Sequence, residues 1–302
     1  MKKISVIISN YNYGHFLNES IQSVLNCEGD FLHEIIVVDD GSTDDSKDIL
    51  LQHYGAHEKV KPVIKENGGQ FSCFRKGIEI ATGDILCFLD PDDRYEPGYF
   101  KHLSEVYEAK PYIDLVYVGY QNVGKKTEVI LKASQDFPIG ITAVRVGLTG
   151  TLFGSLTSAL SMNRYLAKKI LSLPSYYDWD WKVSGDIVLQ LGGIILGGYA
   201  YYLAKPLMRR MIHDTNAVAN RTEKDPIEEY KYQAHRRRLM LAFVKNFNIV
   251  LDDVRLIEKE FERLPTKDFK LSWKYVEAVK KMRAPVLRKF IGAFRVLMAY
   301  FS

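Results

Sequence analysis

The first 93 residues alternate between short apolar runs and amphipathic stretches, and this alternation constrains the fold more than any other feature of the chain. The amphipathic stretches, at 15–26, 44–54 and 71–81, have the spacing of helices. Strands that alternate with helices of this length are typical of βαβ units, which build a parallel sheet covered on both faces. The predicted strands are Ile4–Ile8, Glu34–Val38, Val60–Ile64 and Ile85–Leu89.

Polar loops follow three of these strands. Ligands of such sheets bind at the carboxyl ends of the strands, so the loops Ser9–Tyr13, Asp39–Asp44 and Asp90–Asp93 are expected to meet at one edge. In the third loop three carboxylates fall within four positions: Asp90, Asp92 and Asp93. Like charges this close suit a bound Mg²⁺ or Mn²⁺, ions that usually bind together with substrate phosphates. Taken alone, a solvated acidic turn is the alternative interpretation.

The first two loops offer groups that suit a nucleotide. Tyr11 has a flat ring on which a base can stack, and Asn12 carries a donor and an acceptor, although a turn that caps the next helix explains both equally well. In the second loop, capping by the residues at 42–44 does not require the pair Asp39 and Asp40, which lies where a base or ribose could be held.

A further polar turn, at 66–70, precedes the third predicted helix. Its glycines, Gly68 and Gly69, allow close approach of the backbone, and the helix N-terminus that follows favours anions. A plain strand-to-helix turn explains the glycines equally well. Arg75, inside that helix, is either a diphosphate contact or a solvated helix charge.

In their order and spacing these motifs resemble those of the family 2 glycosyltransferases, which are inverting enzymes that use nucleotide-diphosphate sugars. The matching motifs are Val6–Asn12, Ile36–Asp44, Asn67–Gln70 and Gly83–Asp93. The resemblance implies an α/β fold of the GT-A type, a Rossmann-like mixed sheet with helices on both faces, followed here by a helical C-terminal region. It divides the chain into a glycosyltransferase domain at 1–215 and a helical extension at 216–302.

The resemblance also implies roles for the nucleotide loops. Tyr11 would stack on the base with Asn12 supporting the same loop, and Asp39 would hydrogen-bond the base, most often uracil. Ser9 stands where many members have proline, a change that we expect the fold to tolerate. Arg75 stands where many members have asparagine, so at the expected diphosphate contact this chain departs from the family pattern.

The acidic loop matches the metal-binding motif of the family. The resemblance implies that Asp92 is the direct ligand of Mg²⁺ or Mn²⁺, with Asp90 nearer the ribose and Asp93 competing for the metal. His213 would complete the metal shell or touch the diphosphate, and a structural surface histidine is the alternative. Arg210 lies at the position that best matches a diphosphate clamp, since its fork suits phosphate oxygens.

An inverting transfer needs a carboxylate that deprotonates the acceptor hydroxyl. Family members carry an Asp, often after Glu, at the start of a helix about 20 residues before a Pro-Leu pair, which precedes an Arg-x-His turn. Asp186 fits this spacing to Pro206 and is the predicted base, whereas Asp180 fits it less well. Gly185 replaces the frequent Glu. A helix cap is the alternative role for Asp186.

The segment from 94 to 204 has weaker signals. It predicts a helix at Pro97–Ala109, strands at Leu115–Tyr120 and Glu128–Ala133, and a glycine-rich loop and strand at 140–158 on the acceptor side. The apolar run Ile187–Ala204 is long enough to suggest a membrane span, but four glycines divide it into a helix end, a turn and a strand.

The C-terminal part is basic and helical. From Asn216 onward 19 Lys and Arg stand against 11 Asp and Glu, a net charge of +8. Helices are predicted at Asp225–Asn246, Asp252–Arg263 and Pro285–Phe301. The last has an apolar face flanked by basic residues, which fits an anionic membrane surface, the catalytic domain or a second copy of the chain in a homo-oligomer. The basic residues accompany no recognition motif, so nucleic acid is not an expected partner.

Three cysteines without paired spacing and an early first strand predict a cytoplasmic protein, either free or held at the inner face of the membrane. The expected partners are the sugar nucleotide and a carbohydrate or lipid-linked saccharide acceptor. A nucleotide-sugar-binding protein without catalysis would keep Asp39 and the acidic motif but would not need Asp186. A nucleotidyltransferase would carry a glycine-rich, basic loop after the first strand, which 9–14 lacks.

Overall fold

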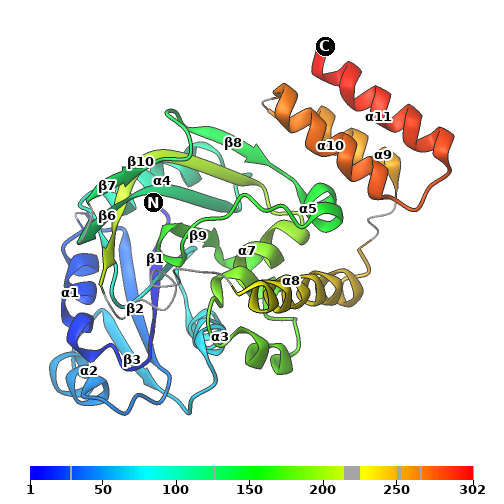
Figure 1. The fold of residues 1–302 in the computed structure, drawn as a ribbon. Helices are drawn as coiled ribbons and strands as arrows, with labels where there is room; N and C mark the ends of the chain where they lie inside the picture. Colours follow the sequence, from blue (N-terminus) through cyan, green and yellow to red (C-terminus); the bar gives the residue numbers. More distant parts are fainter. Residues whose placement is uncertain (28, 125–126, 214–224, 250–252, 266, 302) are drawn as a thin grey trace.

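The computed structural model describes residues 1–27, 29–124, 127–213, 225–249, 253–265 and 267–301. Within these residues one mixed sheet has helices on both faces, and further helices follow at the C-terminal end (Figure 1). The strands are β1 (Ile4–Asn10), β2 (Leu32–Asp39), β3 (Val60–Ile64), β4 (Ile85–Leu89), β5 (Arg94–Tyr95), β6 (Leu115–Gly124), β7 (Glu128–Ile130), β8 (Phe137–Gly140), β9 (Leu160–Asn163) and β10 (Ala200–Ile212). Their order is β3-β2-β1-β4-β9-β6-β10-β5, with β7 on β6 and β8 on β10.

The predicted βαβ half is confirmed. Strands β1 to β4 pair in parallel, and the three helices between them begin and end within two residues of the predicted positions: α1 (Gly14–Leu25), α2 (Ser46–Tyr54) and α3 (Gln70–Ile80). Successive strand side chains point to opposite faces, so Val6 packs in the core that includes α1 and α2. Ile7 packs with α3 on the other face. This half brings the ends of β1, β2 and β4 to one edge of the sheet.

The middle of the chain departs from the prediction in several elements. The glycine-rich span contains a helix, α5 (Ala143–Thr149), and β9 inserts antiparallel between β4 and β6, which makes the sheet mixed. The helix predicted from Pro97 begins later, as α4 (Tyr99–Ala109), because Gly98 before it has a φ of 82°. The run Ile187–Ala204 is confirmed as a helix, a turn and a strand, α7 (Asp186–Ile195) followed by β10. The other elements here are η1 (Thr157–Ala159), α6 (Arg164–Ile170) and η2 (Ser175–Trp181).

The C-terminal region is helical, as predicted, and contains one helix that the sequence pattern did not reveal. Its helices are α8 (Pro226–Asn246), α9 (Val254–Glu262), α10 (Phe269–Lys281) and α11 (Val286–Phe301), of which α10 was not predicted. Helix α8 lies against α7, whereas α9, α10 and α11 form a group with its own apolar core (Figure 1). The predicted domain boundary at 215–216 lies outside the described residues. Within those residues, no helix has the length and apolar character needed to cross a membrane.

Candidate active site

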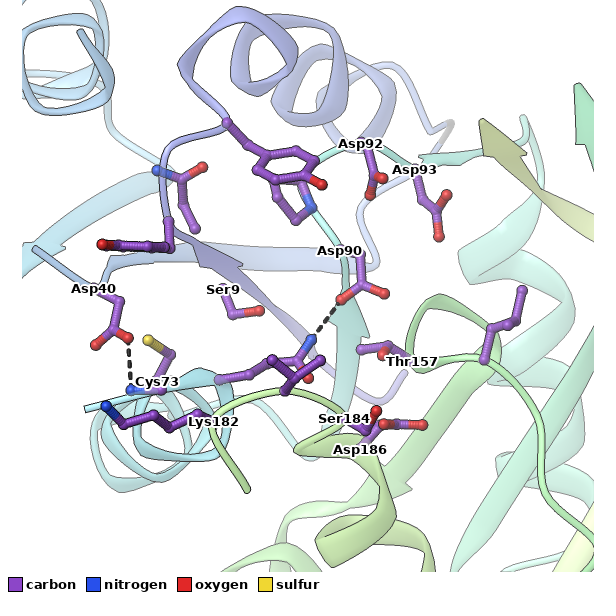
Figure 2. Close-up of a pocket in the computed structure, with 18 of the residues that line it drawn as sticks. Ser9, Asp40, Cys73, Asp90, Asp92, Asp93, Thr157, Lys182, Ser184 and Asp186 are labelled. Carbon is purple, nitrogen blue, oxygen red and sulfur yellow. Dashed lines mark hydrogen bonds between the residues drawn. The ribbon is translucent and has the colours of Figure 1, made fainter. Parts of the chain in front are cut away.

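A cleft of about 620 Å³ opens at the carboxyl ends of β1 and β4, between α3 and the start of α7 (Figure 2). Such a volume is typical of a small-molecule site, since these measure roughly 300–1,000 Å³. Nine of the residues predicted from the sequence line it: Ser9, Tyr11, Asp40, Gly69, Asp90, Asp92, Asp93, Asp186 and Arg210. The structure therefore brings the acidic loop and the distant Asp186 to one cavity.

Tyr11 and Asn12 do different things in the first loop. Tyr11 lines the cleft and is 47% exposed as a residue, so its side chain is accessible to a flat ligand. Asn12 has a φ of 56° and its side-chain oxygen accepts from the backbone N–H of Thr43 at 2.7 Å. It does not line the cleft. Asn12 thus joins the first loop to the second and fixes the backbone next to Tyr11.

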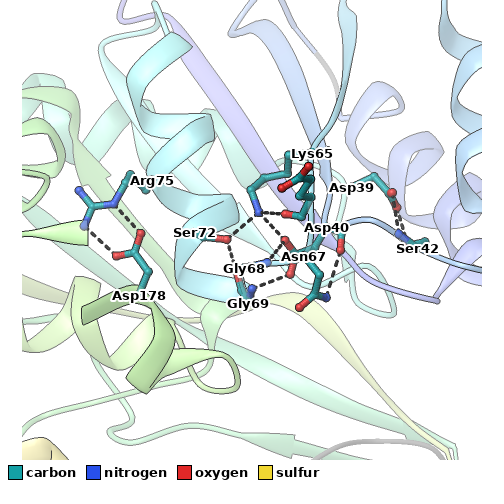
Figure 3. A network of polar contacts seen from close by, with 11 residues as sticks. Asp39, Asp40, Ser42, Lys65, Asn67, Gly68, Gly69, Ser72, Arg75 and Asp178 are labelled. Carbon is teal, nitrogen blue, oxygen red and sulfur yellow. Dashed lines mark hydrogen bonds and ion pairs between the residues drawn. The ribbon is translucent and has the colours of Figure 1, made fainter. Parts of the chain in front are cut away.

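Asp39 is fully buried and lies beside Ser42 (Figure 3). Its Oδ1 accepts from the Nδ2 of Asn10 at 2.7 Å and the hydroxyl of Ser42 at 2.6 Å, and its Oδ2 accepts from the backbone N–H of Ser42 at 3.0 Å. These contacts fix the turn after β2. Asp39 is not among the residues that line the cleft.

Asp40 organises the glycine turn that leads into α3 (Figure 3). Its carboxylate accepts from the backbone N–H groups of Gly68 and Gly69 at 2.9 and 2.7 Å and from the Nζ of Lys65 at 2.5 Å. Gly69 has a φ of 89°, and a Cβ there would lie 2.4 Å from the Cα of Lys182. The turn therefore requires glycine, both for its backbone conformation and for the approach of the segment before α7.

Arg75 does not reach the cleft, so the structure does not support its predicted contact with a diphosphate. Its Nε and Nη2 donate to both carboxylate oxygens of Asp178 at 2.7 Å (Figure 3). The other N–H groups donate to the carbonyl oxygens of Leu171 and Leu173 at 2.9 Å. Arg75 instead attaches α3 to η2, because a planar fork binds a carboxylate through two parallel bonds.

The carboxyl groups of the acidic loop are crowded. Burial, the charge of Asp93 and the charge of Asp92 raise the pKa of Asp90 well above its ordinary value. Burial and the charge of Asp92 likewise raise the pKa of Asp93, although its Oδ2 accepts from the hydroxyl of Ser158 at 2.6 Å and its Oδ1 from the backbone N–H of Met211 at 3.2 Å. This crowding disfavours the ionised form of Asp90 and Asp93, and a cation beside them would stabilise their ionised form.

His213 pairs with one member of this loop. Its Nε2 lies 2.9 Å from the Oδ2 of Asp92, and its ring packs 4.7 Å from the ring of Phe16, measured between centroids. Across the described ranges, no group of three His, Cys, Asp or Glu side chains is arranged to hold a metal ion. Asp92 and His213 together offer an oxygen and a nitrogen donor, which suits Mn²⁺ if phosphate oxygens or water supply the remaining ligands.

Asp186 begins α7 and faces the acidic loop across the cleft (Figure 2). Burial raises its pKa from the ordinary 3.8 to about 6, while the Nε2 of Gln190 donates to its Oδ2 at 2.7 Å. The Nε2 of Gln190 also donates to the carbonyl oxygen of Ser155, and its Oε1 accepts from the backbone N–H of Ser155, both at 3.0 Å. Gln190 therefore fixes Asp186 relative to the loop that closes this side of the cleft.

Gln70 links the two acidic parts of the site, and sequence reasoning assigned it no role. Its Nε2 donates to the Oδ1 of Asp90 at 2.9 Å, and its Oε1 accepts from the backbone N–H of Gly185 at 2.7 Å. A Cβ at Gly185 would lie 2.5 Å from the backbone nitrogen of Phe71, so no larger residue fits this close approach. Gln70 could have been found from the sequence because it is the last residue of the family motif at 67–70. Gln190 and Ser158 belong to no such motif.

Comparisons with known proteins agree with this arrangement. The family profile described as Glycosyl transferase family 2 matches residues 5–170. An uncharacterized glycosyltransferase of Nostoc sp. is 42% identical over 117 residues, which cover 38% of this chain and 36% of the relative. An uncharacterized glycosyltransferase of Rickettsia typhi is 28% identical over 230 residues, 76% of this chain and 69% of the relative.

Among solved structures, the fold is similar to that of S. aureus TarS 1–349 in complex with UDP. The TM-score is 0.61 at 16% identity, and the match covers 99% of this chain and 89% of that one. At this identity the likeness concerns the fold alone. The chain spans only about a third of the length of the Nostoc relative and about two thirds of the Rickettsia one, so similarity to them is similarity to a part.

Proposed function

The chain belongs to glycosyltransferase family 2, and from this membership we propose that it transfers a sugar from a UDP-linked donor to an acceptor hydroxyl with inversion at the anomeric carbon. The observation that carries the proposal is one cleft lined by Tyr11, Asp92 and Asp186, which come from three separate parts of the chain. The product class is a surface polysaccharide or another glycoconjugate. Residues 1–215 form the catalytic domain in this proposal, and 216–302 the helical extension.

The donor binds along the ends of β1 and β2. Tyr11 stacks on the base beside Ser9, while Asn12 and Asp39 hold the loops that present them. The turn formed by Gly68 and Gly69 borders the site, and its backbone N–H groups are held by the Asp40 carboxylate. A UDP-linked donor is supported by the complex of the similarly folded TarS with UDP.

The diphosphate end of the donor lies at the acidic loop. Mg²⁺ or Mn²⁺, when bound there, neutralises the charge that develops on the leaving diphosphate. Asp92 and His213 would hold the ion, since they are already 2.9 Å apart. Asp93 instead orients β10 through Met211, which leaves Asp92 as the better ligand. Arg210, which lines the cleft, adds a second positive charge for phosphate oxygens.

Asp186 is the base of the reaction. The acceptor oxygen attacks the anomeric carbon, the bond from that carbon to the diphosphate oxygen breaks, and the acceptor proton passes to the Asp186 carboxylate. Because Oδ2 is held by Gln190, Oδ1 is the oxygen that takes the proton. A pKa of about 6 leaves the group ionised at neutral pH and yet more basic than an ordinary aspartate.

The proposal is tested by ligand-induced stabilisation and by transfer. UDP with Mn²⁺ is expected to raise the melting temperature of the protein, because a ligand that binds the folded state stabilises it by mass action. Tyr11→Ala should reduce this shift, and Tyr112→Ala, an exposed tyrosine outside the cleft, serves as the matched control. Asp186→Asn should keep the shift and lose transfer from a panel of UDP-sugars. Transfer at the wild-type rate by Asp186→Asn, or no shift with any nucleotide, contradicts the proposal.

A further inference from the structure

Helix α11 exposes a continuous apolar face. Leu287, Phe290 and Phe294 are 72%, 75% and 58% exposed, although residues of this kind are normally buried. At 3.6 residues per turn, the exposed members cover roughly 140° of the helix circumference. We call them the α11 face: Val286, Leu287, Phe290, Ile291, Phe294, Met298 and Phe301.

The rotation of α11 about its own axis is fixed by its opposite side. Gly292 and Val296 are buried against the neighbouring helices α9 and α10. A Cβ at Gly292 would lie 2.3 Å from the Cγ1 of Val254, so the two helices approach as closely as their backbones allow. Because Gly292 and Val296 pack against α9 and α10, the α11 face on the opposite side points away from these two helices. Packing of this face on the catalytic domain, one of the three alternatives left by the sequence, is therefore not observed among the described residues.

Positive charge borders the α11 face. At helical spacing, Arg288 and Arg295 lie along one edge and Lys289 along the other. Arg288 and Arg295 remain 52% and 60% exposed despite their contacts to Asp253 and Glu258. From residue 253 to the end, a range that includes α9 and the carboxylates paired with these arginines, 12 Lys and Arg stand against six Asp and Glu. The surroundings of the face thus carry a net positive charge.

We propose that the α11 face docks on an anionic lipid membrane, with α11 lying parallel to the surface. The apolar side chains enter the boundary between headgroups and acyl chains, while the flanking basic side chains meet anionic headgroups. A second copy of the chain fits less well, because self-pairing of this face would bring two rims of the same charge together. Over its described residues, α11 has neither the length nor the apolar character of a membrane span.

Hydrogen bonds connect the group of helices α9, α10 and α11 to helix α5 in the preceding part of the chain. The carboxylate of Glu260 on α9 accepts from the backbone N–H groups of Val144 and Arg145 at 2.8 and 3.2 Å, and from the hydroxyl of Tyr275 at 2.8 Å. These bonds join α9 and α10 to the N-terminus of α5. The chain continues from α5 into the loop that contains Ser155 and lines the cleft. Membrane docking would therefore hold the cleft at a defined orientation to the membrane.

The proposal is tested by vesicle flotation of the full-length protein. Vesicles of phosphatidylcholine with 30% phosphatidylglycerol are compared with phosphatidylcholine alone, and binding to the neutral vesicles is expected to be at least about tenfold weaker. The variant Leu287→Gln/Phe290→Gln/Phe294→Gln should lower partitioning roughly 100-fold, because three large apolar side chains no longer leave water. The matched control replaces three exposed apolar residues elsewhere: Leu51→Gln/Tyr112→Gln/Tyr165→Gln.

Three results would overturn the proposal. The first is the same recovery of the α11 variant and the control with anionic vesicles. The second is the absence of wild-type binding to either vesicle. The third is a wild-type dimer in sedimentation analysis that the α11 variant converts to a monomer, without vesicle binding, which would assign the face to a second copy. Circular dichroism of the variants confirms that the helices are retained, and the measurement does not depend on whether the cleft transfers sugar.

Discussion

Replacing Asp186 by asparagine is predicted to abolish transfer and also to make the protein more stable. The carboxyl lines the cleft opposite the acidic loop, and burial raises its pKa to about 6. The folded protein therefore binds this proton more tightly than the unfolded chain does. It follows that the free energy of unfolding falls as the pH rises from about 4 to about 6, and stays lower above that range. Asparagine has no proton to lose and escapes this penalty.

The size of the effect follows from the pKa shift. The difference between about 6 and the ordinary 3.8, at about 1.4 kcal/mol for each pKa unit, corresponds to about 3 kcal/mol once the group is fully ionised. The gain in the variant should be about 1 kcal/mol at pH 4.5 and about 3 kcal/mol at pH 8. The asparagine oxygen can still accept from the Nε2 of Gln190, so this contact is not lost.

Urea unfolding of wild type and Asp186→Asn at these two pH values measures the difference directly. Asp30→Asn is the control, since Asp30 is exposed and lies outside the cleft, and it should change neither stability nor transfer. A gain in stability that is the same at both pH values would show that ionisation of Asp186 is not its cause. A loss of stability at pH 8 would falsify the assignment of Asp186 to a destabilising, functional position.

Three further substitutions test how the cleft is supported. Arg75→Ala leaves the buried Asp178 carboxylate unpaired and should lower the free energy of unfolding by about 3 kcal/mol in urea titrations; an unchanged midpoint contradicts this. Gln70→Ala should lower the turnover number roughly 10- to 100-fold with little change in UDP affinity, because it removes the link between Asp90 and α7. Equal losses in both would mean that Gln70 acts on the donor. Gly69→Ala should weaken UDP binding in calorimetry and destabilise the fold by more than about 1 kcal/mol, since its Cβ meets the Lys182 backbone; wild-type affinity would show that the turn can move.

The parts of the fold that the sequence predicted are those specified by local pattern. Strands β1, β2 and β4 are buried over almost their whole length and carry runs of apolar residues, because both faces of the sheet are covered there, and each is followed by turn residues. The convergence of Ser9, Asp40 and Asp90 then follows from topology, since parallel strands end at one edge. Asp186 lies far from Asp90 in the sequence, and no local pattern predicts that the two meet. The family resemblance alone predicted that Asp186 belongs to the same site.

What escaped prediction depends on contacts between distant residues. The sequence left Arg75 as either a diphosphate contact or a solvated helix charge, and only the fold shows that its guanidinium pairs with Asp178, 103 residues away. The side chain of Asp93 turns toward Ser158 and Met211, which belong to elements that pack against the loop from two sides. Helix α10 and strand β9 went unnoticed for a related reason. A short strand such as β9, of four residues, is defined by the neighbours β4 and β6 rather than by its own pattern.

The choice of glutamine on both sides of Asp186 has a physical consequence for the site. Gln190 donates to Asp186 itself, and Gln70 donates to the opposing Asp90 while accepting from the backbone before α7. A lysine or arginine at either position would also hold a carboxylate, but its charge would lower the pKa of that carboxylate and reduce its basicity. An amide fixes the position without adding charge. Asp186 therefore keeps the raised pKa that a base requires, and no cationic side chain at position 70 or 190 competes with a metal ion for the carboxyl groups of the acidic loop.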